Sequence, residues 1–254
     1  MNGFLLIDKP KGVTSSNCVY QLRKLLGIKK IGHCGTLDPL ATGLLPICIG
    51  EATKFSSFMS NLDKTYEVGI RFGIATDTGD IEGEVISKTN NNFDEIKLKN
   101  ILQTFVGPQT QIPPMYSALK QKGKPLYWWA RKGVFLPRKE RNIIIHNIDL
   151  ISFENYQLNI KVSCTKGTYI RSLAESIGEA LLTKATVISL RRLSIGNTES
   201  SQMVLMPKSK INDISSSVLP SDFLLKSLPK VMLIKEDVKK VRNGQSIDYN
   251  AQLE

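Results

Sequence analysis

The stretch Gly32-His33-Cys34-Gly35-Thr36-Leu37-Asp38-Pro39-Leu40-Ala41-Thr42-Gly43-Leu44-Leu45-Pro46 is the most unusual part of the chain. Its three glycines and two prolines surround one histidine and one aspartate. Glycine permits tight or left-handed turns, and Pro39 restricts Asp38 to an extended backbone. The loop leads into an apolar run at residues 44–49, which predicts a buried strand. A carboxylate on a loop held by such a strand suits a nucleophile. Taken alone, the pattern favours the simpler interpretation that Asp38 caps a turn.

The segments around this loop predict a mixture of strands and helices. Apolar or alternating runs predict strands at residues 4–7, 44–49, 66–72, 143–153, 158–163 and 187–193. Helical spacing predicts helices at about residues 15–26, 52–59, 96–105, 125–133 and 169–182. Ser15 or Ser16 is expected to cap the first helix. Residues 28–43 are expected to be a loop, and residues 154–157 a hairpin turn. This order favours an α+β fold with a mainly antiparallel sheet over regular βαβ alternation.

Length and composition limit the class of protein. The 254 residues suit one large domain or one domain with a small appendage, and 41% of them are hydrophobic, so global disorder is excluded. No apolar run approaches 18 residues and the first residues lack a basic segment, so neither a transmembrane helix nor a secretory signal is expected. The four cysteines lack paired spacing and predict free thiols in a reducing cytoplasm.

Several common chemistries lack their motifs. The sequence contains no G-x-G-x-x-G after a strand and no Walker A sequence, so a nucleotide cofactor is not expected. It contains no C-x-x-C and no H-E-x-x-H, so a metal site is not expected. It also lacks the G-x-S-x-G elbow of serine hydrolases.

Positive charge is concentrated in one segment. The formal net charge is +11, and residues 120–141 hold eight basic residues and one acidic residue, a net of +7. The last 46 residues carry only +1, from seven basic and six acidic residues. The basic segment also holds Tyr127, Trp128, Trp129 and Phe135. Basic side chains neutralise phosphates and aromatic rings stack on unpaired bases. The segment is therefore a nucleic-acid contact or, alternatively, a solvated helix with an aromatic inner face.

The loop around Asp38 resembles the G-H-x-G-T-L-D-P-x-A-x-G-x-L-P motif of the TruB-type tRNA pseudouridine synthases, which isomerise uridine 55 in the T loop of tRNA. Further motifs match in order over about residues 3–205. They are Gly3-Phe4-Leu5-Leu6-Ile7-Asp8-Lys9-Pro10, Lys64-Thr65-Tyr66, Thr76-Asp77-Thr78-Gly79-Asp80, Pro113-Pro114-Met115-Tyr116-Ser117-Ala118-Leu119-Lys120, Lys166-Gly167-Thr168-Tyr169-Ile170-Arg171 and Leu190-Arg191-Arg192-Leu193.

The resemblance implies a catalytic set of three residues. Asp38 matches the family's aspartate nucleophile, which attacks the target nucleoside at C6 of the base or at C1′ of the ribose. Arg171 matches the arginine that pairs with this carboxylate. Tyr66 matches the tyrosine that stacks on the uracil and is placed for proton transfer at C5.

The resemblance also implies residues that hold the substrate. Tyr169 and Leu190 match positions lining the uracil pocket, and Lys9 and Pro10 match a pair that supports Tyr66 and the pocket wall. His33 matches a histidine that inserts into the T loop where nucleotides are flipped out. Asp80 is expected among the polar groups around the pocket.

The fold implied by the family is a mixed, mainly antiparallel sheet with flanking helices and a central catalytic cleft. Residues 1–208 would form the catalytic domain, and residues 113–141 its RNA-binding insert, here called the thumb. The cations expected on the RNA backbone are Lys120, Lys122, Lys124, Arg131, Lys132 and Arg141. The resemblance implies no cofactor and no metal, the T-arm of tRNA as partner, no membrane contact, and a cytoplasmic monomer.

The chain departs from the family in three places. Cys34 stands where threonine is usual, and Trp128-Trp129 is more aromatic than usual. Residues 209–254 are too few for the family's C-terminal PUA domain, so at most a reduced remnant is expected there, with a strand and a helix within residues 231–243. Two other interpretations remain: a non-catalytic tRNA-binding or tRNA-folding protein, and an aspartate-dependent hydrolase of a small molecule.

Overall fold

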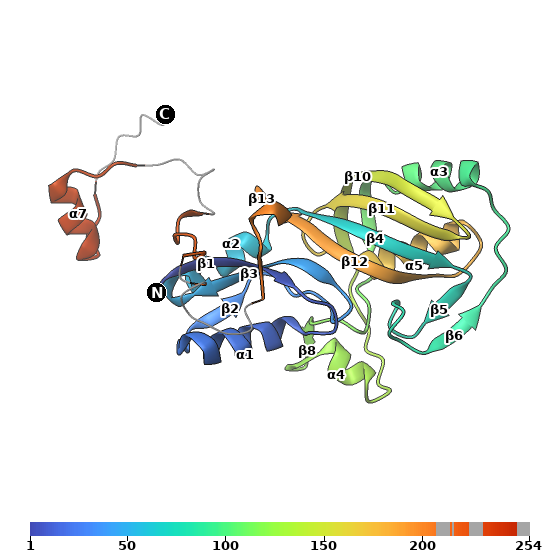
Figure 1. Cartoon of the computed structure of the whole chain (residues 1–254), viewed down its shortest axis with the longest axis horizontal. Coiled ribbons are helices and arrows are strands. Elements are labelled where there is room, and N and C mark those ends of the chain that lie inside the picture. The colour runs from blue at the N-terminus through green and yellow to red at the C-terminus, as the bar shows by residue number, and fades with distance from the viewer. Residues whose placement is uncertain (207–213, 215, 224–230, 248–254) are drawn as a thin grey trace.

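A ten-stranded mixed sheet runs through the body of the protein (Figure 1), in a computed structural model that describes residues 1–206, 214, 216–223 and 231–247. The strands are β1 (Gly3–Lys9), β2 (Ile31–His33), β3 (Thr42–Ile49), β4 (Lys64–Phe72), β7 (Gly107–Gln111), β10 (Arg141–Glu154), β11 (Gln157–Cys164), β12 (Ala185–Ile195), β13 (Thr198–Glu199) and β14 (Val204–Leu205). Their order is β14-β1-β3-β12-β4-β11-β10-β7, with β2 beside β3 and β13 beside β12. Only β1–β14 and β3–β12 are parallel pairs among these, so the predicted α+β class is confirmed.

The helices are α1 (Ser15–Leu26), α2 (Ser56–Ser60) after the 3-10 turn η1 (Gly50–Phe55), α3 (Glu95–Thr104), α4 (Leu126–Ala130), α5 (Ile170–Ala180), the 3-10 turn η2 (Ser200–Gln202) and α7 (Lys235–Arg242). α1 begins after Thr14, whose hydroxyl accepts a hydrogen bond from the Asn17 N–H, and it ends at Gly27 with φ of 67°. The predicted cap at Ser15 or Ser16 is therefore wrong by one residue. No helix among the described residues is long and apolar enough to cross a membrane.

The core lies on both faces of the β1–β3 part of the sheet. On one face lies the main apolar cluster, to which α1 beside β2, α3 beside β10 and α5 beside β12 all contribute. On the other face, a second cluster joins Phe4, Leu6 and Leu44 to Met59 of α2. Strands buried on both faces are continuously apolar. This explains why residues 4–7 and 44–49 carry no polar alternation.

The short or polar strands were not predicted. β2 lies within residues 28–43, which were expected to be a loop, and β7 follows the expected stop of α3. Two small hairpins were missed as well, β5 (Ile74–Thr76) with β6 (Val85–Lys88) and β8 (Lys120–Gln121) with β9 (Lys124–Pro125). The turn at residues 154–157 is confirmed: Asn155 and Tyr156 have φ of 50° and 57°, as a two-residue hairpin turn requires.

The C-terminal segment agrees with prediction only in part. α7 confirms the helix expected before Gly244, and none of its residues is buried. Residues 231–234 form no strand, so that part of the prediction is wrong. Much of the expected segment 209–254, including position 215, lies outside the described residues.

We predict that Gly178→Ala lowers stability. A Cβ at this position of α5 would lie 2.8 Å from the Ala185 Cβ and 2.9 Å from the Ala185 nitrogen. Overpacking of this kind costs about 1–3 kcal/mol, which outweighs the gain of about 1 kcal/mol that alanine brings to an open helix site. Urea denaturation measures the difference. Asn100→Ala, on the exposed face of α3, is the matched control and should be neutral or stabilising; a stabilised Gly178→Ala protein would contradict the close packing of α5 on β12.

Candidate active site

Asp38 lies on a loop between β2 and β3 that three neighbours hold in place. The Ser15 hydroxyl accepts from the Leu37 N–H at 2.9 Å and donates to the Leu37 carbonyl at 3.1 Å. The Pro39 carbonyl accepts from the Gly12 N–H at 2.8 Å and from Lys9 Nζ at 3.3 Å. Both neighbours of Asp38 in the chain are thus fixed through their backbone. The aspartate is therefore held in position by the loop.

Arg171 of α5 connects Asp38 to two other segments. Its Nε lies 2.9 Å from Asp38 Oδ2, and its Nη1 lies 3.8 Å from Asp80 Oδ2. Its Nη1 also donates to the Thr78 carbonyl at 2.6 Å, and its Nη2 donates to the Tyr116 carbonyl at 2.7 Å. The side chain is 5% exposed. One buried guanidinium therefore joins the Asp38 loop, the turn at residues 76–80 and the base of the thumb.

The surroundings of Asp38 act on its carboxyl in opposite directions. The pKa of Asp38 lies above its usual value, because burial raises it more than the Arg171 guanidinium lowers it. Its side chain keeps 33% of its surface exposed, because it faces a cavity. Arg171 therefore favours the charged carboxylate, against the larger effect of burial.

A cavity of about 310 Å³ opens beside Asp38. The predicted residues Tyr66, Tyr169, Arg171 and Leu190 line it together with Asp38. Tyr66 comes from β4 and Leu190 from β12, while Tyr169 is the residue before α5. The Tyr169 backbone is fixed by Gln111 of β7, which accepts from its N–H at 2.7 Å and donates to its carbonyl at 3.0 Å. Five residues from four separate segments of the sequence thus meet at one cavity.

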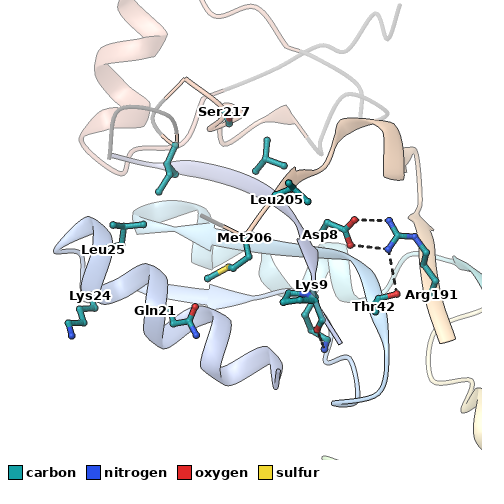
Figure 2. A pocket seen from close by; sticks show the side chains of 13 residues that line it. Asp8, Lys9, Gln21, Lys24, Leu25, Thr42, Arg191, Leu205, Met206 and Ser217 are labelled. Atoms are coloured by element: carbon teal, nitrogen blue, oxygen red, sulfur yellow. Dashed lines mark hydrogen bonds and ion pairs between the residues drawn. The ribbon is translucent and has the colours of Figure 1, made fainter. Parts of the chain in front are cut away.

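Four other predicted residues lie outside the lining of this cavity. Asp80 is buried behind Arg171, and its Oδ1 accepts from the Thr78 hydroxyl at 2.9 Å. His33 is half-buried, and burial, with a smaller effect from Arg192, lowers its pKa, so its imidazole is neutral at pH 7. Lys9 and Pro10 line a separate groove of about 1460 Å³. Figure 2 shows that groove, where Asp8 forms a two-point ion pair with Arg191.

The cavity also contains two cations to which the sequence gave no role. Lys64 and Arg192 both line it, and both are buried. Burial, and next Arg192, lower the pKa of Lys64 to about 8. The strand period could have placed both residues at the cavity, because Lys64 lies two residues before Tyr66 and Arg192 lies two residues after Leu190. Side chains two apart on a strand point to the same face.

The thumb carries its cations on the outside of a small core of its own. Met115, Leu126 and Ala130 are buried together. The β8–β9 hairpin turns at Lys122 and Gly123, both with positive φ. All eight basic residues of the segment are exposed: Lys120, Lys122, Lys124, Arg131, Lys132, Arg138, Lys139 and Arg141. Within the described part of the chain none of them forms an ion pair with a carboxylate.

The aromatic residues of the thumb interact with these cations. Lys132 Nζ lies 4.0 Å from the centroid of the Trp128 ring, and Lys124 Nζ lies 5.6 Å from it. Trp129 packs against the small core and donates from its ring nitrogen to the Gln121 carbonyl. This agrees with the expectation that some of the aromatics are core residues while the cations face solvent.

The sulfur of Cys34 lies 2.7 Å from that of Cys48, and both residues are fully buried. The hydrogen bond with Cys48, and then burial, raise the pKa of Cys34, so it is no ready nucleophile.

The described residues hold no group of three or more His, Cys, Asp or Glu side chains able to bind a metal ion.

Comparison with known sequences gives a consistent result. A family model described as "TruB family pseudouridylate synthase (N terminal domain)" matches residues 23–170. The tRNA pseudouridine synthase B of Chromobacterium violaceum is 44% identical over 257 residues, covering 100% of this chain and 84% of that protein. The protein of the same name from Blochmanniella pennsylvanica is 48% identical over 204 residues, covering 80% of this chain and 78% of its own.

Solved structures share the fold. A chain in the crystal structure of a Cbf5-Nop10-Gar1 complex superposes with a TM-score of 0.74 at 25% identity, covering 95% of this chain and 67% of that one. A chain in the structure of an H/ACA RNP bound to a substrate RNA containing 2′-deoxyuridine has a TM-score of 0.73 at 22% identity, covering 96% of this chain and 67% of its own. The second likeness concerns the fold alone.

We predict that the buried Lys64 makes the free energy of unfolding rise at alkaline pH. Its pKa is about 8 in the folded protein and near 10.4 in an unfolded chain. Between these values the unfolded state binds more protons, so folding becomes more stable as pH rises. From pH 8 to pH 10 this contributes about 2 kcal/mol. Lys64→Met should remove that rise in the free energy of unfolding, measured by urea denaturation, while Lys97→Met, at an exposed position, should keep it. An equal rise in the Lys64→Met protein would show that the ammonium is not desolvated.

Proposed function

Because the chain belongs to the TruB family of pseudouridylate synthases, we propose that it converts uridine 55 in the T loop of tRNAs to pseudouridine, with Asp38 as the nucleophile. The membership itself makes the protein an isomerase of the pseudouridine synthase type. Its relatives are named for tRNA, and tRNA is the substrate class that we assign to it. The position of the uridine and the roles of the residues are the proposal.

One observation carries the proposal. Asp38 pairs with Arg171 at 2.9 Å on the wall of a cavity that also contains Tyr66. An ionised carboxylate held by a guanidinium has both the charge and the direction that a nucleophile needs. A phenol across the same cavity offers a flat face for stacking and an oxygen for proton transfer. The cavity holds about 310 Å³, which suits one nucleoside rather than a helix.

The reaction breaks one bond of the nucleoside and forms another. The Asp38 carboxylate attacks, either at C6 of the base or at C1′ of the ribose, and the bond between C1′ and N1 breaks. The uracil then turns within the cavity, and its C5 bonds to C1′ as the carboxylate leaves. The C5 proton is lost and N1 gains a proton, so the product is an isomer of the substrate.

The side chains around the cavity hold the base while it turns. We assign stacking and removal of the C5 proton to Tyr66, and apolar walls to Tyr169 and Leu190. Taking a uridine out of its stack costs a few kcal/mol, and stacking inside the enzyme offsets this cost. His33, neutral at pH 7, can stack and hydrogen-bond in the space that the flipped nucleotides leave.

The thumb supplies the grip on the RNA backbone. Eight exposed cations without carboxylate partners in the described chain are available to phosphates. Their segment is attached at the active site, because Tyr116 at its base accepts from Arg171 through its carbonyl and donates from its hydroxyl to Asp77 at 3.0 Å. We assign the T-arm to this surface, and residues 1–208 to the catalytic domain.

Asp38→Asn should abolish pseudouridine formation and leave tRNA binding within about twofold. The amide is isosteric but carries no charge and is a poor nucleophile, whereas most of the binding comes from phosphate contacts. The measurement maps pseudouridine in a tRNA transcript after incubation with purified protein. Product at position 55 with the original protein and none with the variant is the expected result.

Two outcomes would contradict this proposal. Equal turnover by Asp38→Asn would show that Asp38 is not the nucleophile. Binding of tRNA without product by the original protein would favour the tRNA-folding alternative. An isolated T-arm hairpin, run beside the full tRNA, tests the substrate assignment: modification of the hairpin at a comparable rate is expected if the thumb and cavity suffice.

Removing three thumb charges should weaken binding in a salt-dependent way. Each phosphate contact contributes about 0.7–0.9 to the slope of log K against log salt concentration. The triple variant Lys120→Gln, Lys122→Gln, Lys124→Gln should therefore show a slope shallower by about 2, measured by filter binding of tRNA between 50 and 200 mM salt. The matched control replaces three exposed lysines outside the thumb, Lys88, Lys97 and Lys161. An equal change in that control would mean that net charge, and not the thumb, drives binding.

A further inference from the structure

Arg192 is a buried cation in the cavity with an unusual set of partners. Its side chain is among the largest that are fully buried, at 1% exposed. Its Nε donates to the Leu44 carbonyl at 2.7 Å, and its Nη2 donates to the Gly35 carbonyl at 3.1 Å. It lies directly opposite Tyr66 in the pairing of β12 with β4, and it hydrogen-bonds the Tyr66 phenol. Among the described residues, no carboxylate acts on it.

This arrangement differs from that of the other buried arginine. Arg171 faces two carboxylates, Asp38 and Asp80. A buried charge without a counter-ion is costly, and such a charge in a functional cavity points to a chemical role. Among the described residues, only carbonyl oxygens and the Tyr66 hydroxyl receive the donors of Arg192. Tyr66 is therefore the partner of Arg192 in the cavity that can itself become an anion and sit close to the substrate.

The direction of the hydrogen bond follows from the chemistry of the two groups. A guanidinium has donors and no acceptor, so the Tyr66 oxygen must accept. The phenol proton then points away from Arg192. Burial raises the pKa of Tyr66, and Arg192 is the largest influence that lowers it. Asp38 and Cys164 act in the raising direction, so Arg192 alone among these named groups favours the phenolate.

We propose that Arg192 is a positioning residue that fixes the Tyr66 oxygen and stabilises the negative charge on it while the C5 proton of the turned uracil is removed. This rests on the proposed function, in which Tyr66 takes that proton. The phenol of Tyr66 first releases its own proton, which is the proton that N1 gains. The phenolate, held by Arg192, then takes the C5 proton, so the C5–H bond breaks and the O–H bond of Tyr66 is restored. The electron pair of the C5–H bond restores the ring double bond, and N1 gains a proton. No oxidant or cofactor is needed, because one proton is lost at C5 and one is gained at N1.

The contacts of Arg192 explain why arginine, and not lysine, suits this position. The planar guanidinium reaches Leu44 of β3, Gly35 of the catalytic loop and Tyr66 of β4 at the same time. A lysine ammonium is a compact charge on a flexible stem and cannot make three such contacts in a fixed plane. Arg192 thus fixes the distance between the loop that carries Asp38 and the strand that carries Tyr66.

The experiment follows the C5 proton directly. Pseudouridine formation is measured in single turnover at saturating RNA, with uridine 55 carrying hydrogen or deuterium at C5. Arg192→Gln keeps a hydrogen-bond donor without the charge. It is expected to slow the reaction about 10- to 100-fold, to leave the tRNA dissociation constant within about twofold, and to increase the C5 isotope effect on the rate. Arg192→Lys is expected to show a smaller loss and also a larger isotope effect than the original protein.

Two controls separate this role from a structural one. Arg191→Gln changes the neighbouring arginine, which faces the other groove and pairs with Asp8, and should change neither the rate nor the isotope effect. In a Tyr66→Phe background, Arg192→Gln should cost much less than in the original protein, because its partner is gone.

Each outcome decides the proposal. An isotope effect that does not change in Arg192→Gln or in Arg192→Lys overturns it, whatever the rates; if Arg192→Gln fails to fold, Arg192→Lys alone decides by the same criterion. Full additivity with Tyr66→Phe also overturns it. Failure of the proposed function itself is seen separately, as an absence of pseudouridine at position 55 with the original protein before any variant is compared.

Discussion

The ion pair between Asp38 and Arg171 is the contact on which the site depends. The two residues are 133 positions apart in the chain, and the same guanidinium also bonds the Thr78 and Tyr116 carbonyls. The catalytic loop, the turn at residues 76–80, the thumb and the start of α5 are therefore joined at one side chain. Burial raises the pKa of Asp38, and the ion pair with Arg171 acts against that rise. One residue, Arg171, therefore sets both the position of the Asp38 carboxylate and its electrostatic environment.

The two buried arginines divide the cavity into two electrostatic halves. Arg171 is neutralised by carboxylates, so its half presents a negative group to the substrate. Arg192 has only neutral partners in the described chain, so its half stays positive, and it lowers the pKa values of His33 and Lys64 nearby. A reaction in which a carboxylate attacks on one side and a proton leaves on the other suits such a division. The arrangement is possible because β12 lies between β3 and β4, where Arg192 reaches both.

Much of the fold and of the candidate site was predictable from the sequence, because the decisive signals are local. The loop around Asp38 combines glycine, proline, histidine and aspartate in an unusual way, and strands such as β4 show the alternation of a half-buried surface. β7 was missed because Gly107-Pro108-Gln109-Thr110-Gln111 has no apolar period; it is a strand because it pairs with the neighbouring β10. Lys64 and Arg192 were missed for a related reason. A cation on a strand normally faces solvent, and only the partners that the fold brings together make its burial possible.

The exposed cations of the thumb lie outside the cavity, but the thumb is attached directly to the cavity wall. Its cations are exposed, yet its small core fixes α4, and Leu119 and Ser117 reach the cavity lining. Tyr116 joins this segment to Arg171 and to Asp77 within a few residues. In the proposed function, an RNA backbone held by these cations would lie at a defined distance from Asp38, because Tyr116 ties the thumb to Arg171, the partner of Asp38. Under that proposal the charge of the thumb would supply affinity for phosphates, and its short attachment would decide which base can reach the carboxylate.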